Sequence, residues 1–316
     1  MPGGAEIDGG VGIEQPRDLR DVRRFSHEAM ATVYEVYAVH ADRQYAAQAA
    51  QATFDLVDRL ERELSRFLPN SDITRINHLA AGESTLVAPS TLECLLIARH
   101  MFDLTDGAFD VSIGTGFASL EFDPDNSVVH ATTRGVQVDL GGIGKGYAVD
   151  LMAELLEEWG LQASLVHGGF SSVLALEPPS GLDGWPLTLS DPSAPSHVLA
   201  RLSVRQTALG ASGLRKGDHI VDPRTGQAAR GRLAAWVAVP RPRESQDPVS
   251  EQQPRAAAAA VTDALTTACM LLRRDQVEAL CRSSPGVEAW ILEDAQLLHF
   301  PAFACGFGQV SPEPSA

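Results

Sequence analysis

The residues best suited to bind a phosphorylated ligand lie in a glycine-rich run from Asp139 to Gly146. A helical pattern begins directly after this run, so its backbone N–H groups and the positive end of the helix could bind a phosphate. The run is not a Walker A motif, because Gly146 follows Lys145 where Ser or Thr is required, and it lacks GxGxxG spacing. Asp139 and Lys145 could contact a flavin or ribose edge and a phosphate, the alternative being a surface ion pair that contributes little.

A second candidate is the segment from Thr262 to Thr267, which we expect to open a helix that continues to Leu272. Asp263 and Thr267 are four residues apart and share one helix face. A carboxylate and a hydroxyl can offer two hard oxygens to Mg²⁺, which completes its octahedron with water and substrate phosphate oxygens. Asp at a helix start is also a common N-terminal cap, and from the spacing alone that is the more usual explanation.

A third candidate is His219, which precedes the turn pattern Asp222-Pro223-Arg224-Thr225-Gly226. Asp222 and Thr225 are better explained as turn formers than as catalytic groups. An imidazole close to the phosphates could act as general base toward an attacking hydroxyl, although a single His is more often a packed or surface residue. The chain contains no HExxH, no pair of CxxC motifs and no GxSxG, so zinc and serine hydrolases lack their minimum parts.

The elements that must position these groups alternate between strands and helices. A half-buried strand pattern over 32–39 leads into an amphipathic helix from Gln44, and a second helix is predicted from Ser90 as N-cap to Phe102. Further strands are predicted over residues 136–140, 163–166, 172–176 and 236–239, and a terminal hairpin over 289–292 and 297–300. The first of these strands leads into the glycine-rich run.

Composition limits the class of protein. With 316 residues, 44% hydrophobic and 21% charged, the chain is long enough for one large domain or two packed lobes. A formal net charge of -16 argues against nucleic-acid binding, and no apolar run is long enough to span a membrane. The four cysteines have no CxxC spacing and the N-terminus has no signal-peptide pattern, so we expect a cytoplasmic protein.

Composition and periodicity along the chain predict a main domain over residues 25–303 and three segments without regular structure. Residues 1–24 have little periodicity and are predicted to be a disordered lead-in. Residues 240–260, rich in Pro, Arg, Gln and Ala, are predicted to be a surface insertion without chemistry, and residues 304–316 a flexible tail.

Six segments, taken in order, resemble the motifs of the FAD:protein FMN transferase (ApbE-like) family over about residues 25–300. Six ordered motifs are far more specific than any one of them. They are Met30 to Thr32; Leu64 to Phe67 with Ser71 to Asn77; Thr105 to Ser112; Asp139 to Tyr147; Ala211 to Gly213 with His219 to Gly226; and Asp263 to Thr267.

The resemblance implies an α+β fold, T-fold-like, in which mixed sheets are flanked by helices and a flavin cleft lies between two packed lobes. It implies that Mg²⁺ is held by Asp263, Thr267 and the backbone carbonyl of Gly142. The implied flavin contacts are Met30, Phe67, Ala108, Phe109, Asp110, Asp139 and Lys145.

The implied reaction cleaves the pyrophosphate of FAD, transfers FMN to a Thr or Ser hydroxyl of an acceptor protein and releases AMP. Water in place of the acceptor would make the protein an FAD pyrophosphatase, and a catalytically weak flavin-binding protein is a further alternative. The chain differs from the family pattern at Ala31, where Gly is preferred, at Phe67, where an aromatic hydroxyl is usual, and at Ala211 and Phe170, where Thr and Asp are common. The connection from Gly114 to Asp139 is also shorter than in relatives.

Overall fold

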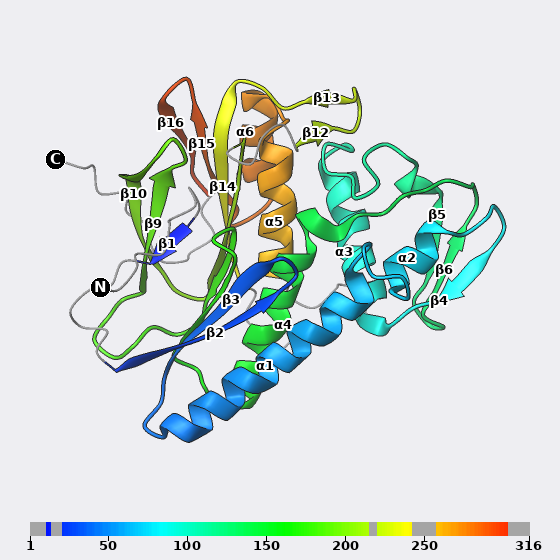
Figure 1. The fold of residues 1–316 in the computed structure, drawn as a ribbon. Helices are drawn as coiled ribbons and strands as arrows, with labels where there is room; N and C mark the ends of the chain where they lie inside the picture. The colour runs from blue at the N-terminus through cyan, green and yellow to red at the C-terminus, as the bar shows by residue number, and fades with distance from the viewer. Residues whose placement is uncertain (1–10, 14–20, 215–219, 242–256, 303–316) are drawn as a thin grey trace.

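The computed structural model describes residues 11–13, 21–214, 220–241 and 257–302. Its centre is an eight-stranded antiparallel sheet in the order β16-β15-β14-β11-β8-β7-β3-β2 (Figure 1). The strands are β2 (Val22–Ala29), β3 (Thr32–Val39), β7 (Ser164–Gly168), β8 (Ser172–Ala175), β11 (Thr207–Gly213), β14 (Arg232–Pro240), β15 (Glu288–Glu293) and β16 (Gln296–Phe300).

Helices cover one face of this sheet. They are α1 (Arg43–Leu64), α4 (Gly144–Glu158) and α5 (Ala258–Cys269), while α6 (Arg274–Ser283) follows α5 beside β15 and β16. The carboxylate of Asp42 caps α1 by accepting from the amides of Gln44 and Tyr45. The apolar stripe of α1, which includes Phe54 and Leu60, packs in the same core cluster as the inward side chains of the sheet.

The other face of the sheet packs on a small second sheet, β1-β9-β10, formed by β1 (Val11–Ile13), β9 (Trp185–Asp191) and β10 (Ala194–Val204). Three buried tryptophans, Trp185, Trp236 and Trp290, fill the space between the two sheets. Successive residues of β14 alternate between this core and the helix-facing core, as expected for a strand buried on both faces.

A smaller group of elements lies beside α1 and α5 (Figure 1). It contains α2 (Asp72–Asn77), α3 (Pro89–Leu104) and a three-stranded sheet of β4 (Ser84–Leu86), β6 (Val128–Ala131) and β5 (Leu120–Asp123). The 3₁₀ turn η1 (Phe117–Ser119) leads directly into β5. The short connection after Gly114 therefore forms a hairpin. Arg99 of α3 fixes it by packing over the Phe117 ring and donating to the carbonyls of Phe117 and Leu120.

The structure corrects several element predictions. Residues 11–13 and 22–24 lie in strands β1 and β2, although composition predicts disorder over 1–24. Residues 136–139 form no ladder, because Asn77 replaces a neighbouring strand: its side chain bonds both the N–H and the carbonyl of Val138. Helix α3 begins at Pro89 with Ala88, not Ser90, at the N-cap.

Helix α5 begins at Ala258, not Thr262, so residues 258–260 of the predicted surface insertion are buried in the core. The N-terminus of α5 is capped from a distance, since the Asp150 carboxylate of α4 accepts from the amides of Ala259 and Ala260 at 2.9 and 2.8 Å. Residues 242–256 and the predicted tail 304–316 lie outside the described residues. Within the described ranges no helix is both long and apolar enough to cross a bilayer.

Candidate active site

A cavity of about 630 Å³ brings together most of the residues singled out in the sequence. Its walls come from the β2–β3 turn, the α1–α2 loop, residues 108–113, the start of α4, the turn after β7, and α5. The predicted residues that line this cleft are Met30, Ala108, Phe109, Asp110, Asp139, Gly142, Lys145, Asp263 and Thr267. Phe67 is not among the lining residues, and His219 lies outside the described residues.

The glycine-rich run forms a 3₁₀ turn, η2 (Leu140–Gly142), that enters α4. The Asp139 carboxylate caps this turn by accepting from the Gly141 amide at 2.9 Å. The Lys145 ammonium donates to the Gly141 carbonyl at 3.0 Å, so the cation lies along the loop at the first turn of α4. A loop backbone, a helix N-terminus and an ammonium thus face one cleft, and together they can hold an anion.

The approach of α4 to α5 depends on Gly146. A Cβ at this position would lie 2.1 Å from the carbonyl oxygen of Ala259, a distance that no side chain tolerates. Because the two helices come this close, the Gly146 amide reaches the Asp263 carboxylate and donates to Oδ2 at 2.8 Å. The close crossing therefore places the carboxylate of α5 beside the glycine-rich loop of α4.

Asp263 is buried in the middle of α5, which excludes the interpretation that it caps a helix start. Its Oδ1 accepts from the Ser172 hydroxyl and its Oδ2 from the Gly146 amide. Burial raises the pKa of Asp263 above its usual value, and the charge of Lys145 and these two hydrogen bonds act against that rise. A buried carboxylate facing a cleft is a site where a cation would be stabilised.

Several hydroxyl groups lie near Asp263 on α5 and the neighbouring strands. The Thr267 hydroxyl donates to the Asp263 carbonyl at 3.2 Å and lies 3.5 Å from the Ser212 hydroxyl, which also bonds Thr266 at 3.0 Å. A Cβ at Gly142 would lie 3.8 Å from the Thr267 hydroxyl, so the loop backbone is close to this group. Ser172 and Ser212 come from neighbouring strands β8 and β11, a juxtaposition that no local pattern predicts.

The donor set is one carboxylate, a hydroxyl and loop carbonyls, which are the hard oxygens that suit Mg²⁺. The described part of the chain contains no group of three or more His, Cys, Asp or Glu side chains that could hold a metal. A metal here would consequently keep several coordination positions for water or for phosphate oxygens of a ligand. The residues present are thus of the kind that Mg²⁺ accepts as ligands.

The β2–β3 turn forms another wall. Met30 and Ala31 both have positive φ, 49° and 56°, and they form the two-residue connection between paired Ala29 and Thr32. This is the backbone of a type I′ turn, which favours Gly or Asn and strains Ala. The backbone at position 31 thus favours Gly over the Ala that this chain has there. The Tyr34 hydroxyl contacts the Met30 sulfur at 3.1 Å and fixes that side chain at the cleft.

The segment 108–113 contributes mainly backbone and buried apolar surface. The Asp110 carboxylate accepts from Ser112 and from the Gly114 amide, so it stabilises its own turn while lining the cleft. Ile113 has a φ of 49°, a strained value for a β-branched residue, and its side chain is half exposed at the cleft. In a separate turn, at residues 222–226, the Asp222 carboxylate accepts two hydrogen bonds from the Arg224 guanidinium, each of 2.9 Å. This supports the interpretation of Asp222 as a turn former.

Arg66 is the clearest cleft residue that the sequence did not single out. Its Nε lies 3.0 Å from Oδ2 of Asp139, and its guanidinium lies 4.7 Å from the centre of the Phe67 ring. Phe67 itself is 79% exposed. Sequence spacing carries no signal for this pair, because Arg66 and Asp139 belong to loops that meet only in the folded chain.

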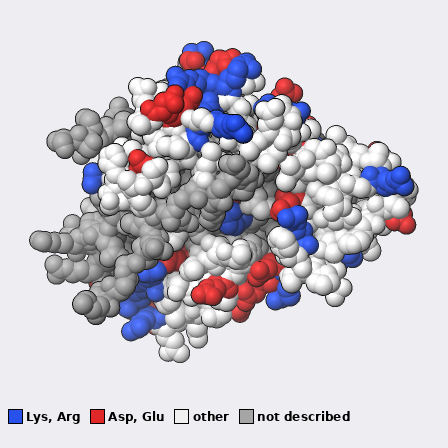
Figure 2. All heavy atoms as spheres, turned by 45° about the horizontal axis from the view of Figure 1, so that its top comes forward, with Lys and Arg blue, Asp and Glu red and all other residues white. Residues whose placement is uncertain are grey.

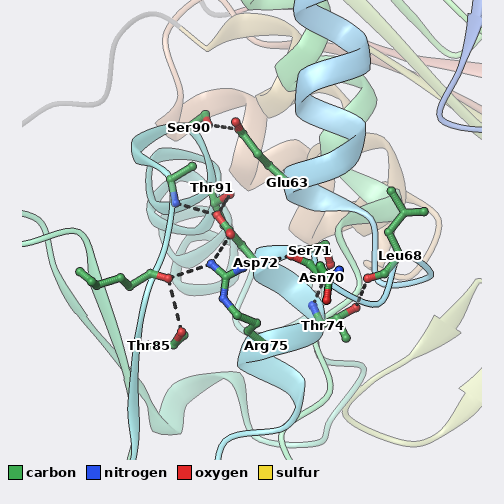
Figure 3. Close-up of polar contacts among 12 residues, drawn as sticks. Glu63, Leu68, Asn70, Ser71, Asp72, Thr74, Arg75, Thr85, Ser90 and Thr91 are labelled. Carbon is green, nitrogen blue, oxygen red and sulfur yellow. Dashed lines mark hydrogen bonds and ion pairs between the residues drawn. The ribbon is translucent and has the colours of Figure 1, made fainter.

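The loop that carries Arg66 is held by α2 (Figure 3). Ser71 caps α2 by accepting from the Thr74 amide, and the Thr74 hydroxyl donates to the carbonyls of Arg66 and Leu68 at 3.2 and 2.8 Å. Asp72 in turn accepts from Arg75 and, at 2.7 Å, from the Thr91 hydroxyl of α3, which ties α2 to the next helix. The loop that carries Arg66 is therefore anchored to α2, and through α2 to α3.

The positive charge of the cleft is local. Among the described residues on the face drawn in Figure 2, acidic and basic side chains are interspersed, and no broad basic surface is seen there. Within the described ranges the cleft is lined by two basic side chains, Arg66 and Lys145, and by three acidic ones, Asp110, Asp139 and Asp263. The two basic groups are thus local points of positive charge at which a small anion could bind.

Comparison with known proteins identifies the family of this chain. The profile of the ApbE family matches residues 30–128 and 115–251, which together cover more than half of the chain. This chain belongs to the ApbE family. Among curated ApbE-type relatives, the FAD:protein FMN transferase of Treponema pallidum is 28% identical over 291 residues, 76% of each chain. That of Vibrio cholerae is 24% identical over 267 residues, 71% of this chain and 78% of the relative.

Solved ApbE structures share the fold. The protein from Thermotoga maritima superposes with a TM-score of 0.74 at 22% identity, covering 88% of this chain and 96% of its own. The flavin transferase ApbE of Vibrio cholerae gives 0.71 at 19% identity, covering 89% and 97%. The predicted family and the predicted α+β fold of several sheets flanked by helices are thereby confirmed. The described strand pairs within these sheets are all antiparallel.

Proposed function

We propose that this protein is an FAD:protein FMN transferase. It cleaves the pyrophosphate of FAD, attaches FMN through a phosphoester bond to a Thr or Ser hydroxyl of an acceptor protein, and releases AMP. The observation that carries the proposal is the buried Asp263 carboxylate at the glycine-rich N-terminus of α4, in a cleft that also holds Lys145. The curated relatives from Vibrio cholerae and Treponema pallidum, which are FAD:protein FMN transferases, support the same assignment.

The chain's own residues have distinct tasks in this reaction. The amides of the η2–α4 loop and the Lys145 ammonium bind the phosphates and orient the FMN phosphorus toward the acceptor hydroxyl. The hydroxyl oxygen attacks that phosphorus while the bond to the AMP oxygen breaks, and AMP leaves with the electron pair. Preorganised N–H and ammonium donors stabilise the charge that develops on the transferring group.

Mg²⁺ would be held by Asp263, Thr267 and the Gly142 carbonyl. When bound, it would neutralise negative charge on the phosphoryl oxygens and so favour attack at the phosphorus and departure of AMP. Asp263 is pre-oriented for this task by Ser172 and Gly146, which fix both of its oxygens. The metal ligands, like the flavin contacts, are assignments that mutagenesis must test.

The proton of the attacking hydroxyl needs an acceptor, and His219 is our predicted general base. Replacing a general base lowers the rate by roughly 10²- to 10⁴-fold and leaves ligand affinity nearly intact. His219→Ala should therefore bind FAD normally and transfer FMN slowly. A proportional loss of binding and transfer would instead assign His219 a packing role.

The deciding experiment incubates the protein with FAD and Mg²⁺, with and without an acceptor protein, and separates AMP, FMN and flavinylated protein. Transfer predicts AMP in equal amount to flavinylated acceptor and little free FMN. AMP and FMN formed at the same rate without acceptor would show that the protein is an FAD pyrophosphatase. Flavin binding without any AMP would show a binding protein.

A further inference from the structure

Arg66 links two groups that belong to different elements of the cleft. Its Nε contacts Asp139, which precedes η2, and its guanidinium packs over the ring of Phe67, its neighbour in the α1–α2 loop. Asp139 and Phe67 are both predicted flavin contacts. Arg66 is thus the side chain through which these two groups are fixed relative to each other.

The contact with Arg66 completes the orientation of Asp139. Oδ1 of Asp139 accepts from the Gly141 amide, and Oδ2 faces the Arg66 guanidinium. With both oxygens engaged, the carboxylate has a single orientation at the cleft. Arg66 can impose it because its own backbone carbonyl accepts from the Thr74 hydroxyl of α2.

The same guanidinium packs over Phe67, which follows the lining residue Arg66 in the chain but does not itself line the cavity. The Phe67 ring is 79% exposed, so the face that Arg66 leaves uncovered is open to a ligand. A cation stacked on one face of the ring restricts its rotation and leaves the other face available. An aromatic face and an oriented carboxylate together match a flat heterocycle with N–H groups at its edge.

Fold stability does not explain this arrangement. The side chains of Arg66 and Asp139 are 45% and 31% exposed, and ion pairs of this exposure contribute little to stability. Arg66 contacts the Asp139 carboxylate, whereas the Lys145 ammonium bonds the Gly141 carbonyl. The two cations therefore have different partners in the cleft.

We propose that Arg66 is a positioning residue of the flavin site, which preorganises Asp139 and Phe67 for the isoalloxazine ring and does not bind the phosphates. This inference rests on the proposed function, because it takes the ligand to be a flavin. It predicts that the loss of Arg66 weakens every flavin equally, whatever its phosphate content.

The test measures dissociation constants for riboflavin, FMN and FAD by flavin fluorescence without added Mg²⁺. Arg66→Ala should weaken all three by one common factor of roughly 3- to 10-fold, the range expected when a preorganising contact is lost. Arg66→Lys should recover part of the loss, because it retains the charge near Asp139 but not the flat stack on Phe67. Arg62→Ala, an exposed Arg one turn earlier on α1, is the matched control and should leave binding unchanged.

A combined variant shows whether Arg66 acts through its two partners. In a background carrying Asp139→Asn and Phe67→Ala, adding Arg66→Ala should raise the flavin dissociation constants by less than about 2-fold. The reason is that the effects of substitutions at contacting residues are not additive. The proposal would be overturned if Arg66→Ala weakened flavin binding as much in that background as in the wild-type protein. It would also be overturned if the single variant weakened binding of FMN and FAD only, or of none of the three flavins. Should the wild-type protein bind none of the three flavins, the proposed function itself fails, which is a separate result.

Discussion

Replacement of Asp263 separates its structural role from its role in metal binding. In Asp263→Ala, the Gly146 amide loses its acceptor at a buried helix crossing, while the Ser172 hydroxyl can rotate. An unsatisfied buried donor costs about 1–3 kcal/mol, and removal of a desolvated carboxylate offsets part of this. We expect the variant to fold with a free energy of unfolding lowered by about 1–3 kcal/mol.

Asp263→Asn is the more informative change. Its amide oxygen can still accept from Gly146, so we expect a stability loss of at most about 1 kcal/mol. It nevertheless removes the negative charge that a metal would need, and AMP release should fall by at least about 10²-fold. The two variants would then differ in stability but share the loss of Mg²⁺-dependent activity.

Urea unfolding followed by tryptophan fluorescence measures the first quantity, since three buried tryptophans report on the sheet core. AMP release across a Mg²⁺ titration measures the second. Asp275→Ala is the control, an exposed Asp in the first turn of α6 that should change neither. Wild-type AMP release by Asp263→Asn, or normal activity per folded molecule in Asp263→Ala, would refute the assignment of Asp263 as a metal ligand.

Four further predictions follow from other parts of the structure. Gly146→Ala should lower the free energy of unfolding by about 3 kcal/mol or more, because its Cβ would clash with the backbone of α5, whereas Gly144→Ala, with only an ordinary contact at 3.7 Å, should fold normally in the same urea titration. Lys145→Ala should weaken FAD binding more than riboflavin binding in a fluorescence titration, and equal losses would place its ammonium away from the phosphates. Ala31→Gly should raise the thermal midpoint by relieving about 1 kcal/mol of strain at a φ of 56°, and an unchanged midpoint would contradict that strain. Burial raises the pKa of Asp150 well above its usual value. The folded state therefore holds this proton more tightly than the unfolded state, and stability should fall as pH rises from about 4 through the raised pKa, a slope that Asp150→Asn should lack in unfolding titrations at several pH values.

The sequence by itself determined the features that depend on local periodicity and ordered motifs. Helical spacing placed Asp263 and Thr267 on one face of α5, and the glycine-rich run indicated a phosphate-binding loop ahead of α4. Nine of the predicted site residues line one cleft because ordered family motifs constrain which segments must meet. His219 remains a prediction, since it lies outside the described residues.

Only the tertiary structure decided how these segments act on one another. The start of α5 was misplaced because its cap, Asp150, belongs to α4, and residues 136–139 form no strand because Asn77 takes the place of a partner. The Arg66–Asp139 contact likewise joins distant loops. Local patterns reflect the preferences of neighbouring residues, whereas each of these contacts connects residues more than sixty positions apart and forms only when the helices and sheets pack.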